Sequence, residues 1–499
     1  MTYAHGMNEA SREEKRLVKY VNRQQMSWRA VDVEQLIDQD HRARVIWELV
    51  GQLDLQRFYE AIESTAEEGG RPAFDPQLLI CLWVYGQSLG IGSAREIERR
   101  CEWDPAFQWM TGLEVVNYHT LADFRVQKKA EVDELFTHLL GVLSAEGLVN
   151  LEQVTVDGTK IKGQASGKSF RREKTLRDHL ELARQRVKEL EEGQGEGVSQ
   201  RIEKAQQRAR REKQKRLEQA LEELEKIREE KPGQEEKSEA RASGSDPEAR
   251  VMKRSGGGGF APSYNTQISS DTKYGIIVDV EVTQARNDYE QLLPAVQRME
   301  KRMKKKPRQV LVDSGFISRE NVEAMAEENI DLLGALADDR AKATRGPRFP
   351  AEKFVYQAEE DRYVCPAGKY LSYEGQQQKD GLTYYKYKAQ WQDCQSCELK
   401  AQCCPENRKH GRSVVQGEES TAMIVFRQKM ETEEAKVQYR KRGAVAEFRN
   451  CWIKAKLGLW QFHVRGLVRT QAEALWACFT HNLQQWILFR RQKTNLAPA

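Results

Sequence analysis

Two short stretches place an aspartate directly after a run of branched apolar residues. In "VTVDGTKI" the run leads into Asp157, and in "VLVDSGF" it leads into Asp313. Such runs are typical of buried strands, and in open α/β sheets the strand tips display polar groups on a rigid support. A single aspartate at a strand end is more often a turn former than a catalyst. Two aspartates in the same setting indicate one shared site.

A third carboxylate, Glu447, lies in the helical stretch "YRKRGAVAEFRNCWIK". It follows Tyr439 and Arg442 and precedes Lys454, with successive spacings of three, five and seven residues. On a helix Tyr439 and Arg442 are near neighbours, and Glu447 and Lys454 lie two turns apart on one face. A carboxylate flanked by cations suits a site that holds divalent metal while it binds phosphates. The alternative is a solvated helix with incidental charge pairs.

The nine cysteines are unevenly distributed, and five of them fall between residues 365 and 404. Four of these have the spacing C-x28-C-x2-C-x5-C and predict a closed, structural zinc site: Cys365, Cys394, Cys397 and Cys403. Such clustering favours metal binding in a reducing compartment over a disulfide framework. Chance clustering is the alternative reading, and His410 is an alternative ligand.

The overall charge indicates no particular partner, because 80 Lys and Arg nearly balance 76 Asp and Glu in 499 residues. Locally, however, residues 436–469 contain nine Lys and Arg against Glu447 alone. A stripe of this kind can release counterions from DNA phosphates. The N-terminus lacks an apolar core of signal-peptide length, and no apolar run reaches membrane-spanning length, so we expect a cytoplasmic protein without a membrane partner.

The first 150 residues are expected to be helical. Asp75 and Ser93 stand at N-cap positions, and Pro76 follows in a first-turn position. The turns "GIGS" and "VNYHT" resemble those of a helix-turn-helix, which makes residues 1–150 a candidate DNA-binding domain. Any small helical domain would show the same pattern, so both readings stay open.

A strand over 151–165 is followed by a charged block over 166–245, in which apolar residues repeat at spacings of four and three. The glycine-rich break "EEGQGEG" predicts that this block folds back as an antiparallel helical hairpin and linker. A solvated spacer or an oligomerisation arm is the simplest role for such a hairpin.

Residues 246–340 predict, in order, a hairpin, a helix, a strand, a helix and a strand, which is typical of a mixed α/β sheet. The strand over 151–165 is expected to belong to the same sheet, although the helical insertion separates it from the other strands along the chain. The expected fold class is therefore α/β, with a ribonuclease H-like core and an all-helical N-terminal domain. Residues 341–430 predict a β-rich insertion that contains the cysteines, and 431–499 a catalytic helix with a helical lid.

Taken together, these features resemble the bacterial insertion-sequence transposases of the DDE type. The likeness rests on the strand-end aspartates, the Tyr-Arg-Glu-Lys constellation, the cysteine cluster and the stretches "DHRARVIWELVGQLDL", "YHTLADFR", "DPEARVMK", "YNTQ" and "FHVRGLVRTQAEALWACFTHNL". Nearest in kind is the group numbered eleven eighty-two, within the assembly around insertion sequences four and five. That assembly usually spaces its Arg and Glu by four residues, whereas Arg442 and Glu447 are five apart. Glu433 and Glu434 are the nearby alternatives to Glu447 as the third carboxylate.

The resemblance implies a site for two magnesium (or manganese) ions. Asp157 would lie between the ions, and Asp313 and Glu447 would each complete one coordination sphere. It further implies that Arg442 and Lys454 bind phosphates of the scissile strand, with Tyr439 packed beside them.

The activity implied is that of a DNA transposase, which binds transposon ends, cleaves phosphodiester bonds and transfers strands. Synapsis of two ends implies at least a homodimer. Two alternatives are a metal-dependent DNA nuclease without strand transfer and a domesticated DNA-binding protein without catalysis.

Overall fold

The computed structural model describes residues 30–62, 72–192, 200–231, 233–253, 259–336, 349, 351–379, 382–404, 410–417 and 420–496. Among these residues no helix has both the length and the apolar character that crossing a bilayer requires. The break "EEGQGEG" lies mostly outside the described residues.

The N-terminal region is helical, as predicted: α1 (Arg42–Gly51), α2 (Gln56–Glu60), α3 (Pro76–Ser88), α4 (Ala94–Trp103), α5 (Pro105–Thr111), α6 (Tyr118–Gln127) and α7 (Lys129–Ala145). The Asp75 carboxylate accepts a hydrogen bond from the backbone N–H of Gln77 and so caps α3, while Ser93 stands at the N-cap position of α4. Most of α3 is buried, which makes it a core helix. DNA recognition by this region stays a prediction.

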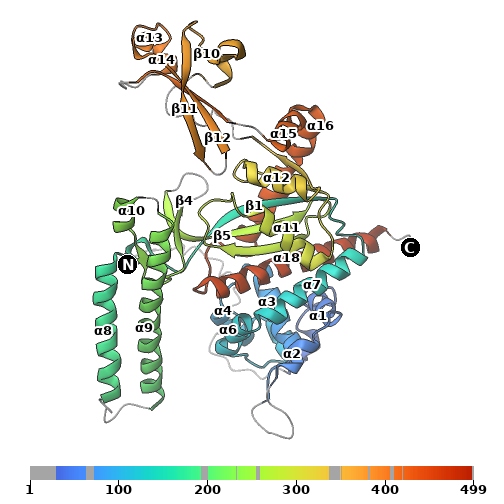
Figure 1. Ribbon diagram of the computed structural model, residues 1–499. Coiled ribbons are helices and arrows are strands. Elements are labelled where there is room, and N and C mark those ends of the chain that lie inside the picture. The colour runs from blue at the N-terminus through green and yellow to red at the C-terminus, as the bar shows by residue number, and fades with distance from the viewer. Residues whose placement is uncertain are drawn as a thin grey trace, which may run out of the picture.

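A mixed sheet forms the centre of the molecule (Figure 1). Its strands are β1 (Gln153–Lys162), β4 (Arg250–Lys253), β5 (Phe260–Asp271), β6 (Ile277–Thr283), β7 (Gln309–Val312) and β8 (Asp331–Gly334). The order is β4-β5-β1-β7-β8, with β6 also paired to β5. Strands β1, β7 and β8 run parallel, and β5 is antiparallel to β1, β4 and β6. Helices α11 (Leu292–Met303) and α12 (Arg319–Glu327) make the crossovers, so the predicted order of elements is confirmed.

The C-terminal helix α18 (Leu467–Leu496) is an internal element, where the sequence suggested a lid. It packs against β6 on one side and against α3 and α7 on the other (Figure 1). Its side-chain amides also satisfy the backbone of strand β6. Asn482 bonds both the N–H (2.8 Å) and the carbonyl (2.7 Å) of Ile277, and Gln471 donates to the Val280 carbonyl at 2.9 Å. Since one continuous apolar core runs through all these layers, the N-terminal helices are part of the scaffold of the sheet.

The charged block forms the predicted hairpin of α8 (Glu173–Glu192) and α9 (Gln200–Glu229), which projects from the core (Figure 1). Its base includes α10 (Gln234–Ser238) and the short strands β2 (Phe170–Arg171) and β3 (Ala242–Ser243). A buried ion pair at 2.6 Å joins Glu223 of α9 to Arg250 of β4. Breaking such a pair costs about 3 to 5 kcal/mol because the remaining charge stays buried, so the base of the hairpin is fixed to the sheet.

The cysteine-containing insertion folds around its own small core, apart from the main one. Its antiparallel sheet has the order β13-β12-β11-β10-β9. The elements are β9 (Val355–Gln357), β10 (Arg362–Val364), β11 (Tyr370–Lys379), β12 (Leu382–Ala389), α13 (Trp391–Gln395), α14 (Lys400–Cys403) and β13 (Ser413–Gly417). The chain then returns to the main sheet through α15 (Thr421–Glu431), α16 (Glu433–Arg442), a π-helical turn η6 (Gly443–Glu447) and α17 (Phe448–Ala455).

Candidate active site

The pairing of β1 with β7 brings the two aspartates together. The parallel register pairs Gln153 with Gln309, and the same offset of 156 residues separates Asp157 from Asp313. The matching runs "VTVD" and "VLVD" therefore lie side by side on neighbouring strands, whose spacing is about 4.8 Å. Asp313 also forms the turn that the simpler reading expected, because its Oδ1 accepts the Gly315 N–H at 2.8 Å. Its other oxygen faces the site.

Glu447 reaches the same place because the helix changes its winding. Residues Gly443–Glu447 form a π-helical turn between α16 and α17. A π turn closes hydrogen bonds from residue i to i+5, so residues five apart come to lie on one face. The spacing of five between Arg442 and Glu447, where the transposases that the sequence resembles usually have four, is thus accommodated by the backbone. Glu433 and Glu434 lie in the first turn of α16, two turns or more away.

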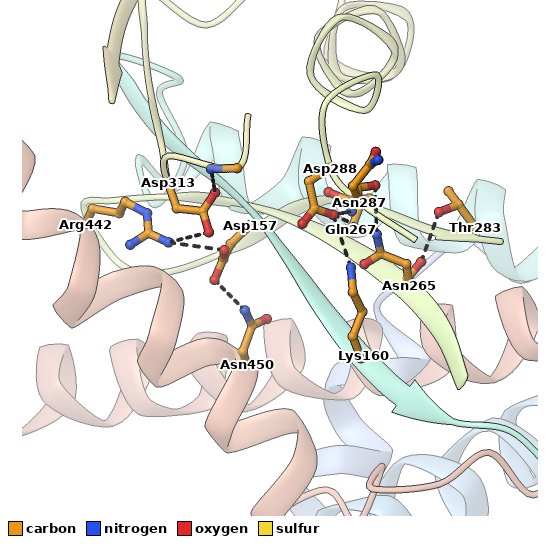
Figure 2. A network of polar contacts seen from close by, with 11 residues as sticks. Asp157, Lys160, Asn265, Gln267, Thr283, Asn287, Asp288, Asp313, Arg442 and Asn450 are labelled. Carbon is orange, nitrogen blue, oxygen red and sulfur yellow. Dashed lines mark hydrogen bonds and ion pairs between the residues drawn. The ribbon is translucent and has the colours of Figure 1, made fainter. Parts of the chain in front are cut away.

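Arg442 joins the three predicted carboxylates. Its Nη2 lies 3.2 Å from Asp157 Oδ1 and 3.8 Å from Asp313 Oδ2 (Figure 2). Its Nη1 lies 3.9 Å from Glu447 Oε1. The side chains are 11% (Asp157), 40% (Asp313) and 71% (Glu447) exposed, so the cluster runs from the protein interior to the solvent. Residues separated by up to 290 positions therefore meet at one guanidinium.

Asp157 is the buried member of the cluster. Asn450 of α17 donates its Nδ2 to Asp157 Oδ2 at 2.8 Å, a contact that the sequence reading missed although Asn450 follows Glu447 by three residues. Burial raises the pKa of Asp157 to about 6; the carboxylates of Asp313 and Asp288 also raise it, and Arg442 lowers it. A carboxyl group with a strongly perturbed pKa and a specific charge partner is a typical feature of functional sites.

A second cluster of polar side chains, centred on Asp288, adjoins the carboxylates at Arg442, and it was not predicted from the sequence. Asp288 Oδ1 accepts hydrogen bonds from Asn265 Nδ2 and Gln267 Nε2, both at 2.6 Å, and lies 3.5 Å from Lys160 Nζ (Figure 2). A Cβ on Gly158 would come within 2.4 Å of the same oxygen, so the glycine beside Asp157 permits this approach. The signal was present in the sequence, since Asn265 and Gln267 of "YNTQ" share one face of a strand.

The two remaining predicted DNA-contacting residues have different surroundings. Lys454 lies near Asp157, and burial lowers the pKa of its ammonium group while the Asp157 carboxylate raises it. Lys160 has a pKa lowered by burial in the same way, opposed by Asp288, Asp313 and Asp157. Tyr439 packs against the apolar residues Leu311 and Leu333 of β7 and β8. The structure thus brings Lys454 to the cluster and uses the Tyr439 ring in packing.

The oxygen donors at this site fit a hard divalent cation in chemical type. Carboxylate oxygens are the ligands that Mg²⁺ and Mn²⁺ prefer, and Asn450 Oδ1, beside Asp157, is buried with no hydrogen-bond partner among the described residues. As the side chains stand, no three His, Cys, Asp or Glu residues in the described part of the chain are grouped closely enough to hold an ion. Arg442 supplies the positive charge between the carboxylates.

The four predicted zinc ligands line one cavity of about 30 Å³ in the β-rich insertion, together with Cys404, but as the side chains stand they are not grouped closely enough to hold an ion. Cys365 Sγ accepts the Lys369 N–H at 3.3 Å, and Cys394 Sγ accepts the Arg412 N–H at 3.4 Å. Backbone donors of this kind stabilise thiolate charge. His410 is not among the residues that line the cavity.

Comparison with known protein families gives two matches. Residues 31–127 match the family model described as a transposase domain (DUF772), and residues 364–487 match one described as a transposase DDE domain. No curated protein and no solved structure matched the chain. The second match contains Arg442, Glu447 and Lys454, whereas Asp157 and Asp313 lie between the two matched regions. Both matches support an insertion-sequence transposase family, a class of polynucleotidyl transferases whose partner is DNA.

The raised pKa of Asp157 gives a stability prediction. The folded chain binds the Asp157 proton more tightly than the unfolded chain, so the stability from that proton is present below about pH 4 and is lost as the pH rises through about 6. Between pH 4 and pH 7 the free energy of unfolding of Asp157→Asn should therefore rise by about 2 to 3 kcal/mol relative to wild type. Urea unfolding measures this difference. Asp178→Asn, at an exposed position of α8, is the control, and an equal pH dependence of both variants would contradict the prediction.

The π turn predicts that one residue can be removed without loss of the Arg442–Glu447 alignment. Deletion of exposed Ala444 should convert η6 to an ordinary α turn with residues four apart on one face, and leave the stability close to that of wild type. Deletion of exposed Cys451 is the matched control. It turns buried Ile453 out of the core and should cost about 2 kcal/mol or more. Equal losses of thermal stability in both deletions would refute the role given to the turn.

Proposed function

We propose that this protein is a DNA transposase of the DDE type, in the group numbered eleven eighty-two. The observation that carries the proposal is the meeting of Asp157, Asp313 and Glu447 at the Arg442 guanidinium. A ribonuclease H-like core is supported by the sheet, in which an antiparallel unit of β6, β5 and β1 continues into the parallel strands β7 and β8. The activity is cleavage of transposon ends followed by strand transfer.

Asp157, Asp313 and Glu447 would hold two magnesium or manganese ions, since DDE transposases generally use divalent cations. Bound there, such ions would supply activation of water or a 3′-hydroxyl and stabilisation of the leaving oxygen in an in-line displacement. Asn450 and the β1 backbone fix the position of Asp157. Because Asp157 is deprotonated only above about pH 6, the site gains its full negative charge near neutral pH.

Arg442 has two sets of partners in this mechanism. Without DNA its guanidinium neutralises the carboxylates, and with DNA a scissile-strand phosphate offers it a second anionic partner. Lys454 and Lys160 place further positive charge beside Asp157, which attracts the same phosphates. Tyr439 keeps α16 packed on β7 and β8 so that Arg442 faces the strand tips. Two transposon ends in one complex would require at least a homodimer.

Cleavage of candidate transposon-end DNA with Mg²⁺ tests this proposal. Glu447→Gln should lower the cleavage rate by about 100-fold or more because it removes a ligand charge without changing shape. Its affinity for the same DNA should stay close to that of wild type. Glu434→Gln, on the neighbouring helix, is the matched control and should cleave normally. Unchanged cleavage by Glu447→Gln would overturn the assignment.

The alternatives give different products in the same assay. Joining of labelled end DNA to a supercoiled plasmid is expected of a transposase. Cleavage without joining would indicate a metal-dependent nuclease, and DNA binding without either reaction would indicate a domesticated DNA-binding protein.

We also propose a structural zinc ion held by Cys365, Cys394, Cys397 and Cys403. The support is their convergence on one small cavity and the backbone N–H groups directed at two of the sulfur atoms. Zinc would tie β10, α13 and α14 together in a domain whose own apolar core is small.

Metal analysis of the purified protein tests the zinc proposal. Wild type should contain one zinc per chain, and Cys394→Ser combined with Cys397→Ser should lose it and unfold the β-rich insertion at a lower temperature. Cys451→Ser, at an exposed thiol of α17, should keep the zinc. Equal zinc contents in both variants would refute this ligand set.

A further inference from the structure

A groove of about 590 Å³ lies between the helical hairpin and the core, away from the three carboxylates. One wall is α9, which contributes Lys215 and Arg216. The other wall is the loop before α18 and the first turn of that helix, which contribute Arg465 and Arg469. The hairpin and the C-terminal part of the chain thus each direct two cations into one opening.

Most of this positive charge lies beyond ion-pair distance of a carboxylate in the described part of the chain, although Glu212 and Glu248 also line the groove. Among the described residues no carboxylate lies within 4.0 Å of Lys215, Arg465 or Arg469, all of which are exposed. Arg216 is half-buried, and in the part of the chain that the structure describes its Nε has no hydrogen-bond partner and the acidic residue paired with it, Glu212, is 3.9 Å away. Burial lowers the pKa of Arg216, and the nearby Arg465 lowers it further. Two like charges held together in this way are stabilised when an anion binds between them.

The groove is built on fixed elements. The Glu223–Arg250 pair anchors α9 to β4, and the Glu248 carboxylate, which also lines the groove, accepts the Leu467 N–H at 2.9 Å. The opposite loop is tied to β1, since Lys162 pairs with Gln461. The cations are therefore positioned before any ligand arrives, which lowers the entropic cost of binding.

We propose that this groove binds the phosphate backbone of duplex DNA, which makes the helical hairpin a DNA-binding arm. The inference rests on the proposed function, because it places the groove on the path of DNA held at Asp157. From Asp157 the strand β1 runs to Lys162, and the groove begins at Gln164. At about 3.3 Å per residue this is roughly 20 Å, so the groove would contact phosphates about six nucleotides from the cleaved bond, at 3.4 Å per nucleotide.

The ligand class follows from the chemistry of the walls. Arginine and lysine side chains spread along an open groove match a row of singly charged phosphates. A DNA backbone that passes the carboxylates is repelled by them, and a second set of cations outside the site compensates for that repulsion. The contacts would be independent of base sequence.

Salt-dependent binding of the full-length protein to a labelled duplex of arbitrary sequence, about 30 base pairs long, tests the proposal. Each phosphate contact contributes about 0.9 to the slope of log affinity against log salt concentration. Arg216→Gln combined with Arg465→Gln should therefore reduce the slope by about 1.8 and weaken binding at low salt. Arg465→Gln alone, at an exposed residue whose loss leaves the fold intact, should reduce the slope by about 0.9.

Lys213→Gln is the matched control, because Lys213 is exposed on the same helix but is turned away from the groove. It should bind like wild type. A wild-type slope in both arginine variants would overturn the proposal, as would an equal reduction by Lys213→Gln, which would indicate diffuse charge on the hairpin. Failure of the proposed function has a different signature, since wild type would then neither cleave transposon-end DNA nor join it to a target, whatever the salt slopes of the arginine variants. Cleavage of a duplex too short to reach the groove should be the same in wild type and in the arginine variants.

Discussion

Three carboxylates do not gather in a protein without an opposing charge, and in this chain Arg442 provides it. Two unit charges 4 Å apart interact by about 4 kcal/mol at the effective dielectric constant near a protein surface. The charges of Asp157, Asp313 and Glu447 repel one another, and solvent screens this repulsion least at buried Asp157 and most at exposed Glu447. One guanidinium within 4 Å of all three offsets it. Arg442 is thus the residue that holds the three carboxylates at one place.

The three carboxylates differ in how rigidly they are held. Asp157 is inside a strand that is hydrogen-bonded on both sides, and Asp313 follows a strand and is fixed by its own turn. Glu447 is mostly exposed and belongs to a helical turn whose winding is unusual. Pairing in the sheet fixes the first two relative to each other, whereas a small change of winding moves the third. If the site admits cations and a DNA strand as proposed, it gains from having one adjustable carboxylate beside two fixed ones.

Much of this arrangement could be predicted from the sequence because its signals are local. The apolar runs before Asp157 and Asp313 predict the two strands, and these strands pair in the sheet. The seam that includes Leu176, Leu180 and Leu217 predicts the helical hairpin, and these leucines are buried in its core. What the sequence did not reveal depends on contacts between distant segments. Asn450 and Asp288 acquire their roles only when α17 and the loop after β6 pack beside β1. The internal position of α18 likewise follows from its amide contacts with β6, which an apolar seam does not encode.

The place of the hairpin in the chain has a physical reason. Strand β1 pairs with β5 and β7, so an insertion after β1 leaves the order of the sheet unchanged. The entropic cost of closing a loop grows only with the logarithm of its length, and an insertion with its own apolar seam adds little to that cost. The buried Glu223–Arg250 pair then fixes the returning chain at β4. An element attached at the end of the strand that carries Asp157, and clamped to the sheet at its base, keeps a constant distance from the carboxylates. Under the proposed function, that constant distance would allow two separate groups of cations to act on one continuous DNA backbone.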